Sequence, residues 1–140
     1  MSRGLFVVYF AADPLTGRRS HWSLFLDDAN ASGVGTIFEA QGGLLQMTYS
    51  RVEKVTPSEE ITYRGTVELC EISDVKIVEF EKIVEGTVLP SSPMKVPKGF
   101  VRKDGQDWVK DVVEALVQKE IVPVDTVEKL EKVPRMVMLE

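Results

Sequence analysis

Few side chains in this sequence can act as a base or a nucleophile near neutral pH. The chain of 140 residues contains one histidine, His21, and one cysteine, Cys70. An imidazole can take or donate a proton, and a thiolate can attack an electrophile. A single residue of each type cannot build a zinc cluster of cysteine and histidine ligands or close an internal disulfide. We therefore expect no metal and no cofactor, with any chemistry centred on His21 or Cys70.

The sequence around Cys70 disfavours a reactive thiol. Cys70 lies in the alternating run Ile61–Ile72, close to Glu68 and Glu71. Neighbouring carboxylates raise the pKa of a thiol because they disfavour the thiolate. A free cysteine in such a strand is most often a small packing residue. We interpret Cys70 as structural.

His21 opens a second alternating segment, His21–Leu26, in which Trp22, Leu24 and Leu26 share one face. His21, Ser23 and Phe25 share the other face. A lone histidine in a strand carries no functional signature, and local hydrogen bonding would explain it equally well. Phe25 would either line a pocket beside His21 or simply pack against its neighbours.

Hydrophobic patterning predicts that strands fill the first half of the chain. Alternating or short apolar runs bounded by turn residues are typical of strands. The polar stretch from residue 50 to residue 60 is predicted to be a connection. The predicted strands are Leu5–Phe10, His21–Leu26, Thr36–Gln41, Leu44–Tyr49 and Ile61–Ile72.

The second half is predicted to hold the helices. Residues 73–85 have apolar positions near helical spacing, an N-cap candidate in Ser73 or Asp74, and a glycine just beyond the end. A helix capped by Asp104 carries the broadest apolar stripe. A short helix would run from Asp125 or Thr126 to Lys132. Residues 135–139 would form a final strand or a docking tail.

These elements predict one α+β domain over residues 1–140, with an antiparallel sheet of about five or six strands against two main helices. A hydrophobic content of 44% is enough for one core. The net charge of -5 gives no attraction to nucleic acid or anionic lipid. No apolar run is long enough for a membrane span or fits a signal peptide, and we expect a cytoplasmic protein.

Three segments together resemble a group of small fungal proteins. They are SHWSLFL (residues 20–26), GTIFEAQG (residues 35–42) and GQDWVKDVVEAL (residues 105–116). That group in turn resembles the circularly permuted papain-like proteins of the NlpC/P60 and lecithin-retinol-acyltransferase branch. The resemblance spans nearly the whole chain, and it rests on the order and spacing of the motifs. It implies a permuted papain-like topology.

The resemblance also implies roles for individual residues. His21 matches the family's catalytic histidine, and Glu39 matches the polar residue that orients the imidazole. The family's cysteine nucleophile corresponds to Gly105, and Asp104 replaces the preceding asparagine of the motif. Glycine cannot form an acyl-enzyme, so covalent thiol catalysis is excluded at this position. An engineered replacement would usually be alanine or serine, which favours natural loss of the cysteine.

The missing side chain would open space at the start of a helix. Gly105 would let a ligand approach the backbone, and the N–H groups that follow, beginning with Gln106, would bind a carbonyl oxygen or carboxylate. We therefore take Gly105, Asp104, Gln106 and Phe25 as candidate substrate-binding residues. Alternatively, Asp104 as an N-cap would occupy those donors itself.

Two functions follow from this interpretation. The first is a small-molecule enzyme of the isomerase, cyclase, lyase or hydrolase type, in which His21, oriented by Glu39, acts as general acid or base. By association with the fungal group, it would belong to secondary metabolism. The second is a catalytically inactive papain-like module for binding or interaction. In that case the apolar tail, residues 136–139, could contribute to a homodimer surface or dock on its own sheet.

Overall fold

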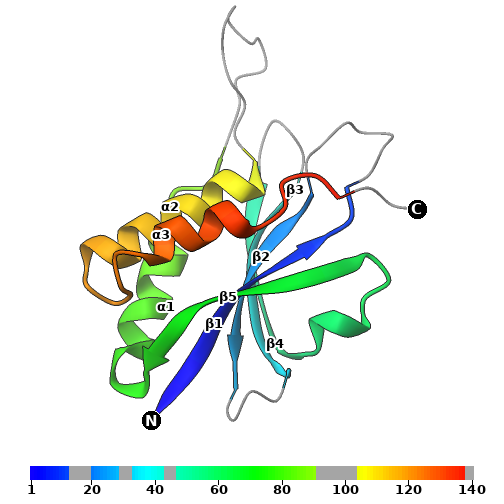
Figure 1. Ribbon diagram of the computed structural model, residues 1–140. Helices are drawn as coiled ribbons and strands as arrows, with labels where there is room; N and C mark the ends of the chain where they lie inside the picture. Colours follow the sequence, from blue (N-terminus) through cyan, green and yellow to red (C-terminus); the bar gives the residue numbers. More distant parts are fainter. Residues whose placement is uncertain (13–19, 29–32, 43–46, 91–103, 138–140) are drawn as a thin grey trace, which may run out of the picture.

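The computed structural model describes residues 1–12, 20–28, 33–42, 47–90 and 104–137. The five strands come before the α-helices along the chain (Figure 1). The strands are β1 (Ser2–Phe10), β2 (Trp22–Asp27), β3 (Gly35–Gly42), β4 (Met47–Val55) and β5 (Tyr63–Ser73). The α-helices are α1 (Ile77–Gly86), α2 (Gly105–Gln118) and α3 (Thr126–Lys129). Short 3-10 helices are η1 (Pro57–Glu59), η2 (Asp74–Lys76) and η3 (Leu130–Lys132).

The five strands form one antiparallel sheet in the order β4-β3-β2-β1-β5. Strands β1 to β4 each pair with the next strand along the chain, and β5 then returns to pair with β1. The helices α1, α2 and α3 lie on one side of the sheet, with α2 and α3 side by side (Figure 1). This arrangement confirms the predicted α+β class and the number of strands.

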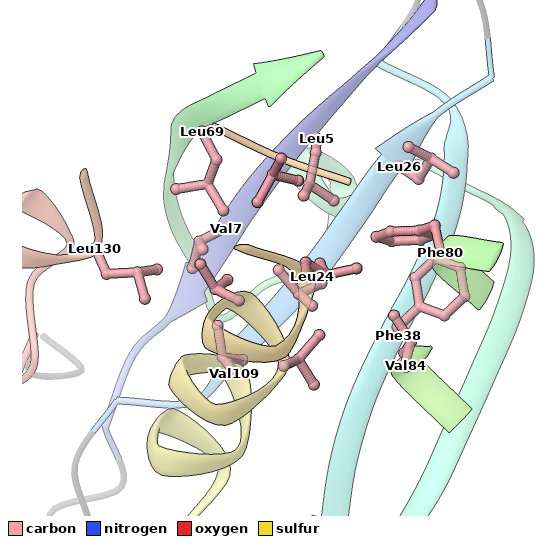
Figure 2. Packing of buried hydrophobic residues seen from close by; sticks show 14 of the residues in the cluster. Leu5, Val7, Leu24, Leu26, Phe38, Leu69, Phe80, Val84, Val109 and Leu130 are labelled. Carbon is pink, nitrogen blue, oxygen red and sulfur yellow. The ribbon is translucent and has the colours of Figure 1, made fainter. Parts of the chain in front are cut away.

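The helix-covered face of the sheet holds the main core. Leu24 on β2 lies opposite Val7 on β1, and both side chains are fully buried with Val109 of α2 (Figure 2). At the other side of this core, the Phe38 ring of β3 meets the Phe80 ring of α1 edge to face, with ring centroids 5.5 Å apart. Burial of these apolar side chains is the main stabilising contribution to the fold.

The opposite face of the sheet has a smaller apolar cluster of Val8, Phe10, Phe25 and Ile37. No α-helix covers this cluster in the described part of the chain, and the strand-connecting turn η1 contributes a buried Pro57 beside it. The Phe10 ring also makes an edge contact with Tyr63 of β5 at a centroid distance of 6.5 Å. The two faces of the sheet are therefore covered in different ways.

The prediction for the fourth strand was wrong in extent. Strand β4 runs over Met47–Val55, so the polar stretch predicted as a connection is largely strand, and residues 44–46 lie outside the described residues. β4 is at the edge of the sheet, where polar side chains on both faces can remain in water. Arg51, for example, is exposed on β4. It forms ion pairs with Glu53 on its own strand and Glu81 on α1.

The predicted helix over residues 73–85 begins differently from expectation. Ser73 precedes the 3-10 turn η2, its side chain makes no capping hydrogen bond, and regular α-helix begins only at Ile77. The predicted strand Ile61–Ile72 is present as Tyr63–Ser73. The short predicted helix ending at Lys132 is present as α3 followed by η3.

Helix α2 begins as predicted, with Asp104 as its N-cap. The Asp104 carboxylate accepts from the backbone N–H groups of Gln106 and Asp107, at 3.0 and 3.3 Å. Asp107 completes a capping box by accepting from the Asp104 N–H at 2.8 Å. The cap fixes where α2 starts and therefore where Gly105 lies.

The segment after η3 docks as a tail over residues 134–137. The indole N–H of Trp22 donates to the Pro134 carbonyl at 3.0 Å, and Ala12 donates its backbone N–H to the Val137 carbonyl at 2.6 Å. The Arg135 guanidinium lies over the Trp22 ring, 5.2 Å from its centroid. This confirms a docking tail as far as residue 137; residues 138–139 of the prediction lie outside the described residues.

Candidate functional site

The candidate site lies where β2 begins and α2 begins. His21 immediately precedes β2, and its backbone carbonyl accepts from the Phe10 N–H at 2.9 Å at the end of β1. The Phe10 ring lies beside the imidazole with a centroid distance of 5.7 Å. The His21 side chain is 36% exposed, so it is held by the sheet and still reachable from solvent.

Glu39 lies on the neighbouring strand, β3, and hydrogen-bonds to the Nε2 atom of His21. Ser23, fully buried on β2, supports this pair: its hydroxyl lies 3.1 Å from His21 Nε2 and donates to Glu39 Oε2 at 3.1 Å. A carboxylate accepts only, so Nε2 must carry the proton. The second ring nitrogen, Nδ1, is therefore the atom through which His21 can accept a proton.

The pKa of Glu39 reflects this arrangement. Burial raises the pKa of the carboxyl, but the hydrogen bond and charge of His21 oppose burial, as do hydrogen bonds from Ser23 and Gln41, and the result is a pKa below the ordinary value of 4.5. Glu39 is therefore ionised at neutral pH. An ionised partner holds the imidazole in one orientation.

Gly105, the first residue of α2, faces the free nitrogen of His21. A Cβ atom at this position would lie 3.8 Å from His21 Nδ1 and 3.5 Å from the Ala40 carbonyl oxygen, both ordinary contact distances. A side chain would therefore fit here, next to the proton-accepting nitrogen. Instead, glycine leaves the space open.

A cleft of about 350 Å³ occupies this space. It contains five of the six predicted site residues, and a ligand of a few carbon atoms or a small ring would fit it. The lining residues are Ser20, His21, Glu39, Ala40, Gln41, Gly42, Met47, Asp104, Gly105 and Gln106. A second hollow, of about 330 Å³, lies against the same pair and includes Phe10, Glu60 and Thr62.

The start of α2 is not an open anion site. The Asp104 carboxylate occupies the N–H groups of both Gln106 and Asp107, as the alternative interpretation of Asp104 expected. Two of the donors that would bind a carbonyl oxygen are thus satisfied internally. Asp104 therefore lines the cleft and fixes the start of α2, and it leaves these donors closed to a ligand.

Gln106 is predicted to bind substrate, yet its side chain has a structural task. It is 2% exposed, and its amide nitrogen donates to the Ser20 carbonyl at 2.7 Å and to the Arg135 carbonyl at 2.9 Å. Ser20 also donates its N–H to the Arg135 carbonyl at 3.0 Å. Gln106 therefore ties the residue before His21 to the docked tail.

Phe25 does not join the other predicted site residues. It lies on the same face of β2 as His21, as predicted, but four residues along the strand it packs against Phe6 at a centroid distance of 6.2 Å. It lines a separate hollow. Alternation along a strand predicted the face correctly, whereas distance along the strand decides which pocket a residue lines.

The sequence analysis did not select Ser23 or Met47 as site residues. Ser23 has a detectable signal, since it lies two residues after His21 and so on the same face. Met47 lines the cleft from β4, and its position depends on the pairing of Gly42 with Met47, which no local pattern reveals. Cys70 is no alternative nucleophile, because burial raises the pKa of its thiol to about 11 although Thr126 and Lys129 oppose this shift.

Two further classes of feature are absent from the described ranges. No group of three or more histidine, cysteine, aspartate or glutamate side chains is arranged there to hold a metal ion. Among the same residues, no helix is long and apolar enough to cross a membrane.

The fold and site define an α+β domain with a histidine–glutamate pair facing the glycine that starts a helix. The chain belongs to DUF6540, a family of unknown function, whose family model matches residues 8–123. The match includes His21, Glu39 and Gly105 and ends before the docked tail. No curated protein matches the chain. No solved structure matches it either.

Proposed function

We propose that this protein is a small-molecule enzyme in which His21, oriented by Glu39, acts as general acid or base without a covalent intermediate. The observation that carries the proposal is the direction of the imidazole. Its Nε2 is bound to Glu39, and its Nδ1 faces the open cleft at Gly105. A base held by an ionised partner beside an accessible cavity is the minimal equipment for proton transfer.

The reactions that fit need no nucleophile from the protein. His21 Nδ1 would accept a proton from a substrate C–H or O–H bond or from a water molecule, and Glu39 would stabilise the imidazolium formed. The same proton would then return to the product or to the leaving group. Isomerisation, elimination, cyclisation and hydrolysis by an activated water all follow this scheme.

A permuted papain-like origin is consistent with this proposal. In that interpretation Gly105 stands where the family's cysteine would be, and the nearby His21 Nδ1 is the atom that would activate it. Loss of the thiol would leave the acid–base pair and a vacated cavity. The substrate would be a small molecule, and a setting in fungal secondary metabolism remains an association from the resemblance.

The alternative function is an inactive binding module. The internal capping of α2 by Asp104 favours it, because the donors that a papain-like enzyme would direct at a substrate are partly occupied. In this case Met136, which is 50% exposed on the docked tail, could contribute to a homodimer surface.

A cysteine introduced by Gly105→Cys would report whether His21 is a competent base. Its thiol would lie beside Nδ1, so we expect alkylation by iodoacetamide at pH 7 to be about tenfold or more faster than for an ordinary thiol. The matched control is Gly105→Cys combined with His21→Asn, in which the acceleration should disappear. The unsubstituted chain gives the background, because its only thiol is the poorly ionised Cys70.

Equal rates in the single and double variants would overturn the enzyme proposal and favour the inactive module. If the acceleration is present, His21→Ala should abolish turnover of a substrate found by screening while retaining the cooperative unfolding of the parent. Loss of folding in that variant would instead assign His21 a structural role.

A further inference from the structure

The separate hollow that Phe25 lines has no role in the proposed acid–base function. It has a volume of about 330 Å³ and lies on the face away from the helices, between β1, β2, η1 and β5. Its walls are mainly apolar, with Phe6 and Val8 from β1, Phe25 from β2, Tyr63 from β5 and Pro57 from η1. This volume is at the lower end of the range for small-molecule sites.

The walls favour a flat aromatic ligand. The Phe6 and Phe25 rings are tilted by 43° to one another and Tyr63 lies across the hollow on β5, so rings form more than one wall. Aromatic rings pack well in offset or edge-to-face arrangements, which such tilted walls provide. The Val8 and Phe25 side chains at the floor are 1% and 4% exposed, so the floor is preformed by the core of this face.

Among the described residues that line the hollow, one side chain is charged. Asp27, at the end of β2, is 3% exposed, and its Oδ2 accepts from the Gly33 N–H at 2.9 Å. A carboxylate in an apolar wall repels anions, because little water is present to screen the charge.

We propose that this hollow binds a small aromatic molecule that is neutral or cationic, of the indole, phenol or arylamine class. The rings would hold the aromatic body, and the Asp27 carboxylate would disfavour an anionic ligand. This site is separate from the cleft: Phe25 and Asp27 lie four and six residues beyond His21 on the same face of β2, and the buried Ser23 lies between His21 and Phe25. Its test therefore does not depend on the proposed acid–base function.

Indole is a suitable neutral probe, and benzoate is a matched anion of similar size. In a titration followed by amide NMR shifts, indole should bind with a Kd of about 1 mM or tighter, and benzoate at least about tenfold more weakly. The shifted amides should be those of β1, β2 and η1 around the hollow. Shifts confined to residues 21, 39 and 105, or equal binding of both probes, would overturn the proposal.

A blocking variant provides the second test. Thr66 is exposed on β5 at the rim of the hollow, so Thr66→Trp should fill the opening and weaken indole binding about tenfold or more while the fold is retained. Glu71→Trp is the matched control, because Glu71 is exposed on the same strand outside the hollow. Equal loss of binding in both variants, or in neither, would contradict the assignment of this site.

Discussion

The two faces of the sheet differ in packing: one is filled by apolar side chains, and the other has polar side chains and hollows. On the helix-covered face, the inward side chains of the central strands are apolar and almost fully buried, from Leu5 on β1 to Phe38 on β3. On the opposite face, the histidine–glutamate pair and the aromatic hollow lie at different points along the strands. A single strand, β2, contributes to both faces through alternate residues. One face thus supplies most of the stability, which allows the other to keep polar groups and open space.

Adjacent residues on β2 provide the sharpest test of this difference. Leu24 and Ser23 are both fully buried, but they lie on opposite faces. Leu24→Ala should lower the free energy of unfolding by about 2–5 kcal/mol, because it leaves a cavity in the main core. Ser23→Ala should cost only about 1 kcal/mol, the value of a lost hydrogen bond. Urea denaturation would measure both, and equal losses would show that the faces do not differ in this way.

The cap of α2 should have an intermediate effect. Asp104→Ala removes two hydrogen bonds to the first turn and should lower the free energy of unfolding by about 1–2 kcal/mol. Glu114→Ala, an exposed change within the same helix, should remain within about 0.5 kcal/mol of the parent. If both variants unfold at the same urea concentration, the capping box does not hold the helix start.

The smallest expected effect is the pH dependence contributed by Glu39. Folding lowers the pKa of Glu39 below 4.5, so its ionised form stabilises the folded state above that pH, and this contribution is lost as pH falls through the folded pKa. Glu39→Gln should therefore be less stable than the parent at pH 7, with the difference shrinking toward pH 3. A difference that stays constant over urea titrations across this range would show that the charge of Glu39 does not support the fold.

Local patterns predicted much of the fold, and the resemblance selected His21, Glu39 and Gly105, which the structure brings together. A continuous apolar run identified β1, alternation identified β2 and β5, and the apolar stripe with its aspartate cap identified α2. The position of β4 was not predictable in this way, because an edge strand with polar residues on both faces has no period-two signal. The contribution of Met47 depends on strand register, which the pairing of β3 with β4 decides.

The docked tail has a consequence for the order in which the cleft is completed during synthesis. His21 and Glu39 lie on neighbouring strands of one hairpin, so they can meet early, whereas Gln106 needs Arg135 as well as Ser20 for its hydrogen bonds. At about 5–20 residues per second, Arg135 is synthesised several seconds after Gln106. A nascent chain would thus hold its acid–base pair first and acquire the finished wall around it only when the tail has left the ribosome.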